Sequence, residues 1–293
     1  MLSRKKRVVT KYYLFKNQSK INKPQISLSA VTSITKIITY TMFIQYASDL
    51  HLEFPANKKF LKAHPLQPVG DILVLSGDIV PFRILDKHPD FFSYVADHFK
   101  TTYWLPGNHE YYHFDIAKKS GILQEKIRSN VFLVNNTSVV HENTRLLFST
   151  LWSNISEANQ WQIERSLNDF HQIKNNGFRL SAEKYNQLHE DSLAFLKQAV
   201  LEATEERLLV CTHHCPTFLN YPAQYKGDAL NEAFAVELFD WIETSNIHSW
   251  VYGHHHSNTP GFSIGKTQLL TNQLGYVQQH EHLQFKTDKC IEL

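Results

Sequence analysis

Short hydrophobic runs of three to six residues recur along the chain, and each ends in glycine or in a group of polar residues. Runs of this length that are rich in β-branched and aromatic side chains are typical of buried strands. The pattern therefore predicts strands at residues 43–48, 72–76, 102–105, 131–134, 145–149, 208–211 and 250–252.

Hydrophobic residues spaced three or four positions apart predict helices between several of these strands. The spacing occurs at residues 91–100 and 230–244. It is clearest at residues 183–201, where Ser181 is a favourable N-cap residue. Strands that alternate with helices favour an α/β fold in which helices cover a largely parallel or mixed sheet.

The composition favours one folded domain over most of the chain. Of its 293 residues, 42% are hydrophobic and 20% are charged, which is typical of a globular protein with a core. There is no Pro- or Gly-rich linker and no internal repeat, so we predict a single domain at residues 42–293. No run approaches the roughly 18 apolar residues that a membrane span needs, so no membrane contact is expected.

Three cysteines, Cys211, Cys215 and Cys290, are too few and too irregularly spaced for a disulfide framework. We therefore expect a reducing, cytoplasmic location. The sequence makes no prediction of the oligomeric state.

Basic residues are concentrated at the N-terminus, where residues 1–41 contain nine Lys or Arg and no acid. Met42 stands one residue before the first predicted strand, and we interpret residues 1–41 as a disordered extension or a misassigned start. A targeting segment is the alternative, although the stretch lacks the continuous apolar core of a signal peptide. The remaining 252 residues carry 21 basic and 28 acidic side chains, which argues against a nucleic-acid groove.

Five of the predicted strands are each followed at once by a small group of His, Asp or Asn side chains. The groups are Asp49-Leu50-His51, Gly77-Asp78, Gly107-Asn108-His109-Glu110, Thr212-His213-His214 and Gly253-His254-His255-His256. In an open α/β sheet, the strand exits on one edge form a single crevice where ligands bind. We therefore expect these five groups to meet in one place.

The spacing within the groups suits metal ligation. Residues i and i+2 of an extended chain point the same way, so Asp49 and His51 can bind one ion together. His254 and His256 have the same spacing and can reach two neighbouring ions. Carboxylate, amide and imidazole ligands without thiolate suit a divalent transition metal such as Mn, Fe, Zn, Co or Ni, and of these we expect Mn.

The order Asp-x-His, Gly-Asp, Gly-Asn-His-Glu, His, Gly-His-x-His resembles the calcineurin-like metallophosphoesterase superfamily. The resemblance implies a four-layer α-β-β-α sandwich of two mixed sheets flanked by helices. It implies one ion held by Asp49, His51, Asp78 and His256, and a second held by Asp78, Asn108, His213 and His254. His109 matches the family histidine that is not a ligand and lies over the substrate phosphate.

The function implied is metal-dependent hydrolysis of a small phosphomonoester or phosphodiester. A hydroxide that bridges the ions would attack phosphorus, while Asn108 orients the ester and His109 protonates or hydrogen-bonds the leaving oxygen. A metal-dependent nuclease is one alternative, against which the acidic body counts. A non-catalytic scaffold is another, against which the complete ligand set and His109 count.

Some neighbouring residues have open assignments. His214 competes with His213 as a ligand, and Glu53 and Glu110 either orient a ligand histidine or lie in water at the surface. Some protein phosphatases of the superfamily have an acid in a longer Gly-Asp block that pairs with the equivalent of His109. Here the block offers no such acid, which counts against a phosphoprotein phosphatase.

The rim of the pocket is predicted to decide between a monoester and a diester. We expect it to come from residues 152–180 and 217–230. Trp152 and Asn154 are candidates for contact with a leaving group, and a core position is the alternative for Trp152. His113 is a further candidate for the pocket lining.

Overall fold

The computed structural model describes residues 9–11, 37–39 and 42–293, and the chain divides into two compact units, residues 1–42 and 43–293. In the first unit, strand β1 (Val9–Lys11) pairs antiparallel with β2 (Ile37–Thr39). The rest of the predicted basic extension lies outside the described residues, so its interpretation stays a prediction.

Two six-stranded mixed sheets form in the described part of the second unit. The first has the strand order β16 (Cys290–Glu292), β3 (Phe43–Ala47), β4 (Ile72–Ser76), β5 (Thr101–Leu105), β7 (Val131–Asn135) and β6 (Leu123–Arg128). Its inner strands β3, β4, β5 and β7 are parallel, and the edge strands β16 and β6 are antiparallel to their neighbours.

The second sheet has the strand order β14 (Phe262–Ile264), β15 (Thr267–Thr271), β13 (Ser249–Tyr252), β12 (Arg207–Thr212), β9 (Thr144–Ser149) and β8 (Thr137–His141). Strands β15, β13, β12 and β9 are parallel, and the edge strands β14 and β8 are antiparallel to their neighbours. A separate two-stranded ribbon pairs β10 (Lys174–Asn175) with β11 (Phe178–Arg179).

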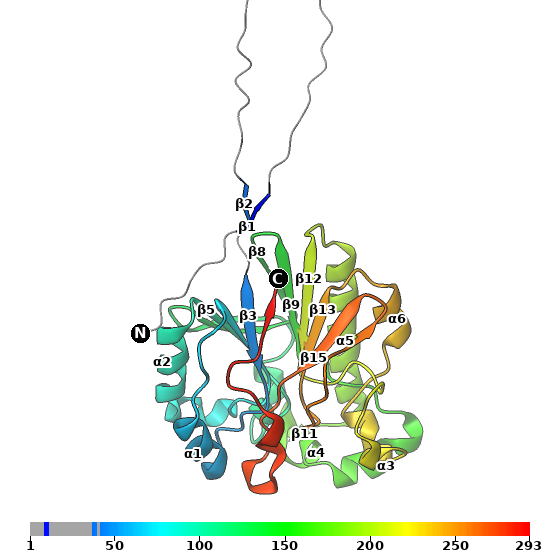
Figure 1. Cartoon of the computed structure of the whole chain (residues 1–293). Coiled ribbons are helices and arrows are strands. Elements are labelled where there is room, and N and C mark those ends of the chain that lie inside the picture. The colour runs from blue at the N-terminus through cyan, green and yellow to red at the C-terminus, as the bar shows by residue number, and fades with distance from the viewer. Residues whose placement is uncertain (1–8, 12–36, 40–41) are drawn as a thin grey trace, which may run out of the picture. The chain divides into compact units, whose positions relative to one another are not determined.

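Helices cover the outer face of each sheet, which gives four layers (Figure 1). Helices α1 (Pro55–Ala63) and α2 (Pro89–His98) share a hydrophobic cluster with the first sheet. Helices α5 (Ala182–Leu201) and α6 (Phe239–Thr244) share another with the second sheet. The predicted sandwich of two mixed sheets flanked by helices is therefore confirmed. No helix of the described residues is long and apolar enough to cross a membrane.

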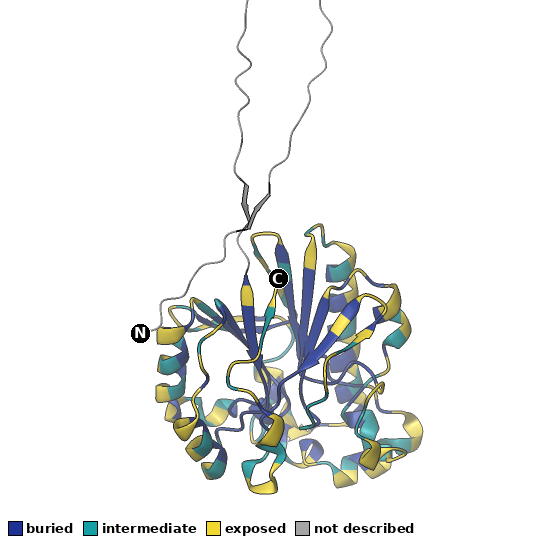
Figure 2. Cartoon of the chain, in the orientation of Figure 1, coloured by how far each residue is buried: buried dark blue, intermediate teal, exposed yellow. Residues whose placement is uncertain are grey.

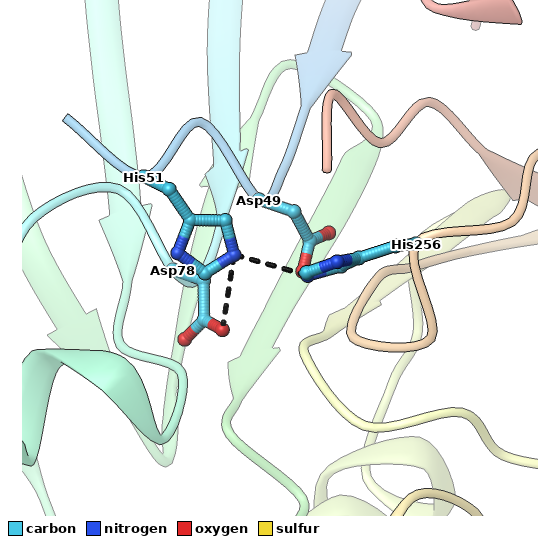
Figure 3. Close-up of side chains that lie close together, drawn as sticks. All are labelled: Asp49, His51, Asp78 and His256. Carbon is cyan, nitrogen blue, oxygen red and sulfur yellow. Dashed lines mark hydrogen bonds and ion pairs between the residues drawn. The ribbon is translucent and has the colours of Figure 1, made fainter. Parts of the chain in front are cut away.

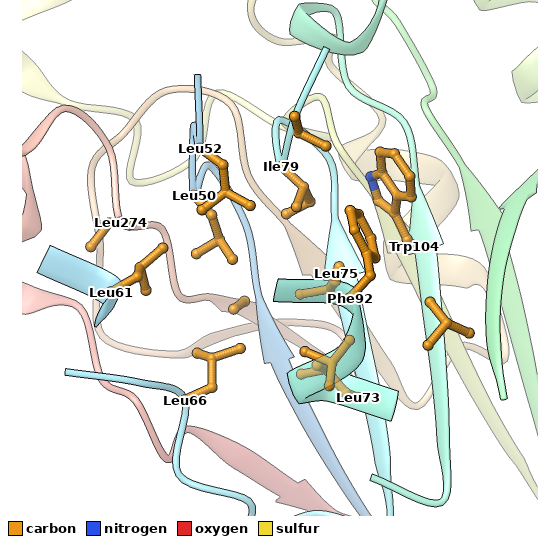
Figure 4. Packing of buried hydrophobic residues seen from close by; sticks show 14 of the residues in the cluster. Leu50, Leu52, Leu61, Leu66, Leu73, Leu75, Ile79, Phe92, Trp104 and Leu274 are labelled. Atoms are coloured by element: carbon orange, nitrogen blue, oxygen red, sulfur yellow. The ribbon is translucent and has the colours of Figure 1, made fainter. Parts of the chain in front are cut away.

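Strand β4 shows how the layers pack, because all five of its residues are buried. Leu73 and Leu75 contribute to the cluster that contains Leu61 of α1 and Phe92 of α2 (Figure 4). A strand that is buried on both faces reads as a continuous apolar run, as this one does. The inner strands of the two six-stranded sheets are buried along most of their length, whereas the helices expose one side (Figure 2).

All seven predicted strands are present, with ends that differ by at most one residue. Helix α5 confirms the prediction at residues 183–201, and the Ser181 hydroxyl accepts a hydrogen bond from the Lys184 N–H, as an N-cap should. Helix α2 confirms the prediction at residues 91–100, shifted by two residues toward the N-terminus.

The helix predicted at residues 230–244 is wrong as one element. A 3₁₀ helix, η5 (Ala229–Ala233), and the short helix α6 are separated by an extended segment. Cys215, which follows β12, pairs with that segment: its N–H donates to the Phe234 carbonyl, and its carbonyl accepts from the Val236 N–H. Pairing with residues after β12 thus takes the backbone groups that a continuous helix would need.

Candidate metal centre

Strands β3, β4, β5, β12 and β13 all end at one crevice between the two sheets. Hydrogen bonds between backbone groups and side chains tie these strand ends together. The His254 N–H donates to Asp49 Oδ1 over 3.1 Å, and the His213 ring nitrogen Nδ1 lies 2.9 Å from the Ser76 carbonyl oxygen. Residues separated by more than 200 positions in the sequence therefore meet, as predicted.

The turns after the strands use a left-handed backbone. The φ angle is +56° at Asp49, +48° at His51, +55° at Asp78, +80° at His254 and +51° at His256. Side-chain-bearing residues rarely adopt this region, and local strain of this kind is concentrated at functional sites. The turns aim these side chains into the crevice instead of continuing the strands.

The first group of donor atoms comes from Asp49, His51, Asp78 and His256, whose atoms lie within 4.8 Å of one another (Figure 3). The two Nε2 atoms of His51 and His256 are 3.0 Å apart. His256 Nε2 lies 3.4 Å from Asp49 Oδ1, and His51 Nε2 lies 3.8 Å from Asp78 Oδ2.

The second group shares Asp78 with the first and adds His213 and His254. His213 Nε2 lies 3.3 Å from Asp78 Oδ1 and 3.1 Å from His254 Nδ1. Asn108 Oδ1 is 3.1 Å from the same His213 nitrogen. Ligands that hold one ion at about 2.0–2.2 Å lie about 3–3.5 Å apart, so both groups fit transition-metal ions.

His213 and the neighbouring His214 point in different directions. His214 Nε2 lies 3.0 Å from the Tyr185 hydroxyl, and its Nδ1 lies 3.2 Å from the Thr150 carbonyl oxygen. Both of its nitrogens thus have partners outside the two donor groups. His255 also points elsewhere, because its Nδ1 accepts a hydrogen bond from the Ser257 N–H.

Burial and neighbouring charges shift the pKa values of the donor groups in opposite directions. Burial alone would raise the pKa of Asp78, but the imidazoles of His213 and His109 hold it well below its usual range. Burial opposes charge on His213 and His256 too, yet nearby carboxylates raise their pKa values to about 9 and about 10. Burial, together with other imidazoles, holds the pKa of His254 well below its usual range.

Glu53 contacts both a proposed ligand and His109. Its Oε1 lies 3.1 Å from His51 Nδ1 and 3.0 Å from His109 Nδ1. Burial alone would raise the pKa of Glu53, but these two hydrogen bonds lower it to about 2. Glu53 is therefore the acid partner of His109 that the Gly-Asp block does not offer. The close spacing of Asp49, His51 and Glu53 was a sequence signal for it, although the left-handed φ angles of Asp49 and His51 show that the chain is not extended there.

Two further acids orient proposed ligands, and sequence reasoning missed both. Glu281 Oε2 lies 2.8 Å from His256 Nδ1. The Asn108 amide donates to Asp169 Oδ1 over 2.8 Å, which leaves Asn108 Oδ1 facing His213. Asp169 falls inside the predicted rim at residues 152–180, but neither residue belongs to a recognisable motif.

Two tyrosines, also missed, surround His109. Tyr112 stacks on its ring with centroids 4.0 Å apart, and the Tyr112 hydroxyl donates to Asp169. The Tyr276 hydroxyl lies 3.4 Å from His109 Nε2. His109 is thus held from three sides, by Glu53 and by the two tyrosines.

Glu110 neither orients a histidine nor lies at the surface, which corrects both sequence-based assignments. It is fully buried and accepts hydrogen bonds from the backbone N–H groups of Asp78, Ile79 and Gly107 and from the Trp104 indole. Burial and the nearby Asp78 carboxylate raise its pKa to about 7. Glu110 therefore holds the Gly-Asp turn in place.

A cavity of about 370 Å³ opens over the two donor groups. Its lining includes Asn168 and Asp169 from the first predicted rim segment, and Tyr221, Tyr225 and Asp228 from the second. Trp152 is 2% exposed and packs with other core aromatics, so its alternative core position is the one found. Asn154 is exposed and does not line this cavity.

Comparisons with known proteins agree with this architecture. A family model described as calcineurin-like phosphoesterase matches residues 46–258. The chain is 32% identical over 277 residues to the uncharacterized protein L509 of Acanthamoeba polyphaga mimivirus, which covers 85% of this chain and 96% of that protein.

Two solved structures are similar to the chain. One is the phosphopantetheinyl hydrolase PptH of Mycobacterium tuberculosis, with a TM-score of 0.60, 16% identity, and coverage of 85% of this chain and 95% of that one. The other is a dimetal phosphatase from Danio rerio, with a TM-score of 0.41, 14% identity, and coverage of 79% and 87%. The likeness to PptH shows the fold.

We expect Glu110→Ala to lower the free energy of unfolding by about 4 kcal/mol or more, because each buried N–H group that loses its acceptor costs about 1–3 kcal/mol. Urea denaturation of the metal-free protein measures this. Glu190→Ala, at an exposed position of α5, is the control and should change the value by less than about 0.5 kcal/mol. Equal stability of the two variants would contradict the role of Glu110.

Metal binding should release protons at pH 7. The metal-free protein holds protons on His213 and His256, since their pKa values of about 9 and about 10 lie above that pH. Ligand nitrogens must lose those protons, so the affinity for Mn²⁺ should rise from pH 6 to pH 8. Titration calorimetry in two buffers of different ionisation enthalpy counts the protons. Binding without any proton release would show that the two rings are not ligands.

Proposed function

Because this chain belongs to the calcineurin-like phosphoesterase family and is a phosphoric ester hydrolase, we propose that it hydrolyses a small phosphate ester with two divalent metal ions. The observation that carries the proposal is the pair of donor groups that share Asp78 and lie beside His109. When bound, two such ions would lower the pKa of a water molecule and neutralise phosphate oxygens.

We assign one ion to Asp49, His51, Asp78 and His256, and the other to Asp78, Asn108, His213 and His254. The ligand distances support this assignment, and so do the acids that contact His51, His256 and Asn108. Asn108 would also orient the ester, because the hydrogen bond from its amide nitrogen to Asp169 fixes the direction of the amide group. His213 is preferred to His214 because His214 has partners for both ring nitrogens.

His109 is the proposed proton donor to the leaving oxygen. Its Nδ1 is engaged by Glu53, so its Nε2, which has only the longer 3.4 Å contact with the Tyr276 hydroxyl, would face the substrate. Burial alone would lower the pKa of His109, but the carboxylates of Asp78 and Glu53 raise it, which favours the protonated acid form. A histidine held in this way can give a proton without moving.

The lining of the cavity favours a small ester over a nucleic acid. Among the described residues that line it, none is lysine or arginine, whereas nucleic-acid grooves neutralise phosphates with those residues. A nuclease therefore gains no support, and the intact ligand set and His109 count against a non-catalytic scaffold. The preference for Mn²⁺ and a cytoplasmic location stay predictions.

The first test is metal reconstitution of the full chain. Protein stripped by a chelator should hydrolyse neither p-nitrophenyl phosphate nor bis-p-nitrophenyl phosphate, and activity on at least one should return with Mn²⁺. Fe²⁺, Zn²⁺, Co²⁺ and Ni²⁺ serve as comparisons, and the preferred ester separates phosphatase from phosphodiesterase. Absence of bound metal at saturating concentrations would overturn the proposal.

His109→Ala should keep its metal content and lose about 100-fold or more in turnover, the usual worth of a general acid. Glu53→Gln should lose about 10-fold at saturating metal, because it weakens the hold on His109. Adding Glu53→Gln to the His109→Ala variant should cost little further turnover, since both changes act on one unit.

Glu281→Gln is the matched control for these variants, because Glu281 contacts a proposed ligand but not His109. It should weaken metal binding while keeping turnover near the wild-type value once metal is saturating. Wild-type turnover of His109→Ala would refute the acid role, and equal behaviour of the two glutamate variants would refute the specific part given to Glu53.

A further inference from the structure

A second cavity, of about 400 Å³, lies beside the first. His109, Tyr112, Asn168 and Tyr276 line both cavities. None of the seven proposed ligands lines the second cavity. His109 is therefore the boundary between the metal centre and a separate space of a size that holds an organic group.

The proposed reaction gives that space a role. In an in-line displacement, the oxygen of a water molecule that has given one proton to the solvent forms a bond to phosphorus, while the bond to the leaving oxygen breaks on the opposite side. The leaving oxygen takes a proton from His109. Because His109 lines both cavities, a leaving group that takes its proton has the second cavity within reach. This step rests on the proposed function.

Arg83 is the one arginine or lysine among the described residues that line either cavity. It belongs to the 3₁₀ helix η1 (Phe82–Lys87), which follows the turn that carries Asp78. Its side chain forms no hydrogen bond or ion pair with any residue that the structure describes. Glu53, the acid in the same cavity, is already engaged by His51 and His109.

Arg83 is exposed at the edge of the second cavity, and an unpaired guanidinium there favours a particular chemistry. Its planar N–H donors match the geometry of a carboxylate or a phosphate, and such charge-assisted pairs are about twice as strong as neutral hydrogen bonds. Phe54, Ile84 and Tyr276 supply apolar surface around it, and His113, a candidate from the sequence, supplies a polar edge. The cavity is thus suited to an organic group that ends in an anion.

We propose that the second cavity binds the leaving group of the substrate, and that this leaving group carries a carboxylate or a second phosphate that Arg83 recognises. The substrate class is then a phosphate ester of an anionic alcohol or phenol. Arg83 acts in specificity, by holding the part of the substrate that departs.

The test compares phosphate release from phenyl phosphate with release from 3-carboxyphenyl and 4-carboxyphenyl phosphate by metal-loaded full chain. We expect kcat/KM to be about 10-fold higher for at least one carboxylated ester, the gain typical of a hydrogen bond to a charged group. Arg83→Gln should bring this ratio close to one, and Arg83→Lys should keep part of it. Benzene-1,3-diyl bisphosphate, corrected for its two equivalent phosphates, shows whether a phosphate is preferred to a carboxylate.

Arg207→Gln is the control, because Arg207 is exposed at the start of β12, at the opposite end from the strand exits. It should leave every ratio unchanged. This inference would be overturned if phenyl phosphate were turned over as well as every anionic ester. It would also be overturned if the preference for an anionic ester survived in Arg83→Gln. Either result would leave the proposed function standing. Failure of the metal-loaded protein to hydrolyse any of these esters or bis-p-nitrophenyl phosphate would overturn both.

Discussion

The proposed centre depends on strands that stop abruptly and turn the next side chain into the crevice. Left-handed backbone at side-chain-bearing residues costs about 1–2 kcal/mol each, and five of the proposed ligands adopt it. Hydrogen bonds between neighbouring turns offset the cost, since Asp49 N–H donates to the Gly77 carbonyl and His51 N–H to the Asp78 carbonyl. Glycine is required at Gly77, because a Cβ atom there would collide with the His213 ring.

A second set of contacts fixes the direction in which the proposed ligand side chains point. Three proposed ligand side chains have a second polar atom in contact with an acid, Glu53 for His51, Glu281 for His256 and Asp169 for Asn108. His213 differs, because its Nδ1 lies against the Ser76 carbonyl oxygen. Such partners fix which atom faces the ion and make the ligand a better donor. Glu53 differs from the others because it also engages His109, so one carboxylate aligns the metal centre with the proposed acid.

The strand exits were predictable because both signals are local: an apolar run followed by a group of potential ligands. The orienting acids were not, since Asp169 and Glu281 reach their partners across 61 and 25 positions and have no spacing that marks them. The helix predicted at residues 230–244 failed for a related reason. Its apolar spacing is helical, but residues after β12 take its central backbone groups, and a tertiary contact of that kind leaves no mark on the local pattern.

The balance of charge in the crevice explains why divalent cations suit this fold. Asp49, Asp78 and Asp169 are buried, and no lysine or arginine is among the described residues that line the first cavity. Burying a carboxylate costs several kcal/mol unless a cation pairs with it. Protons on His213 and His256 supply that positive charge in the metal-free protein. A phosphate ester would add more negative charge to the same space. Two divalent cations would supply more positive charge than the two protons that they replace, and they would therefore favour its entry.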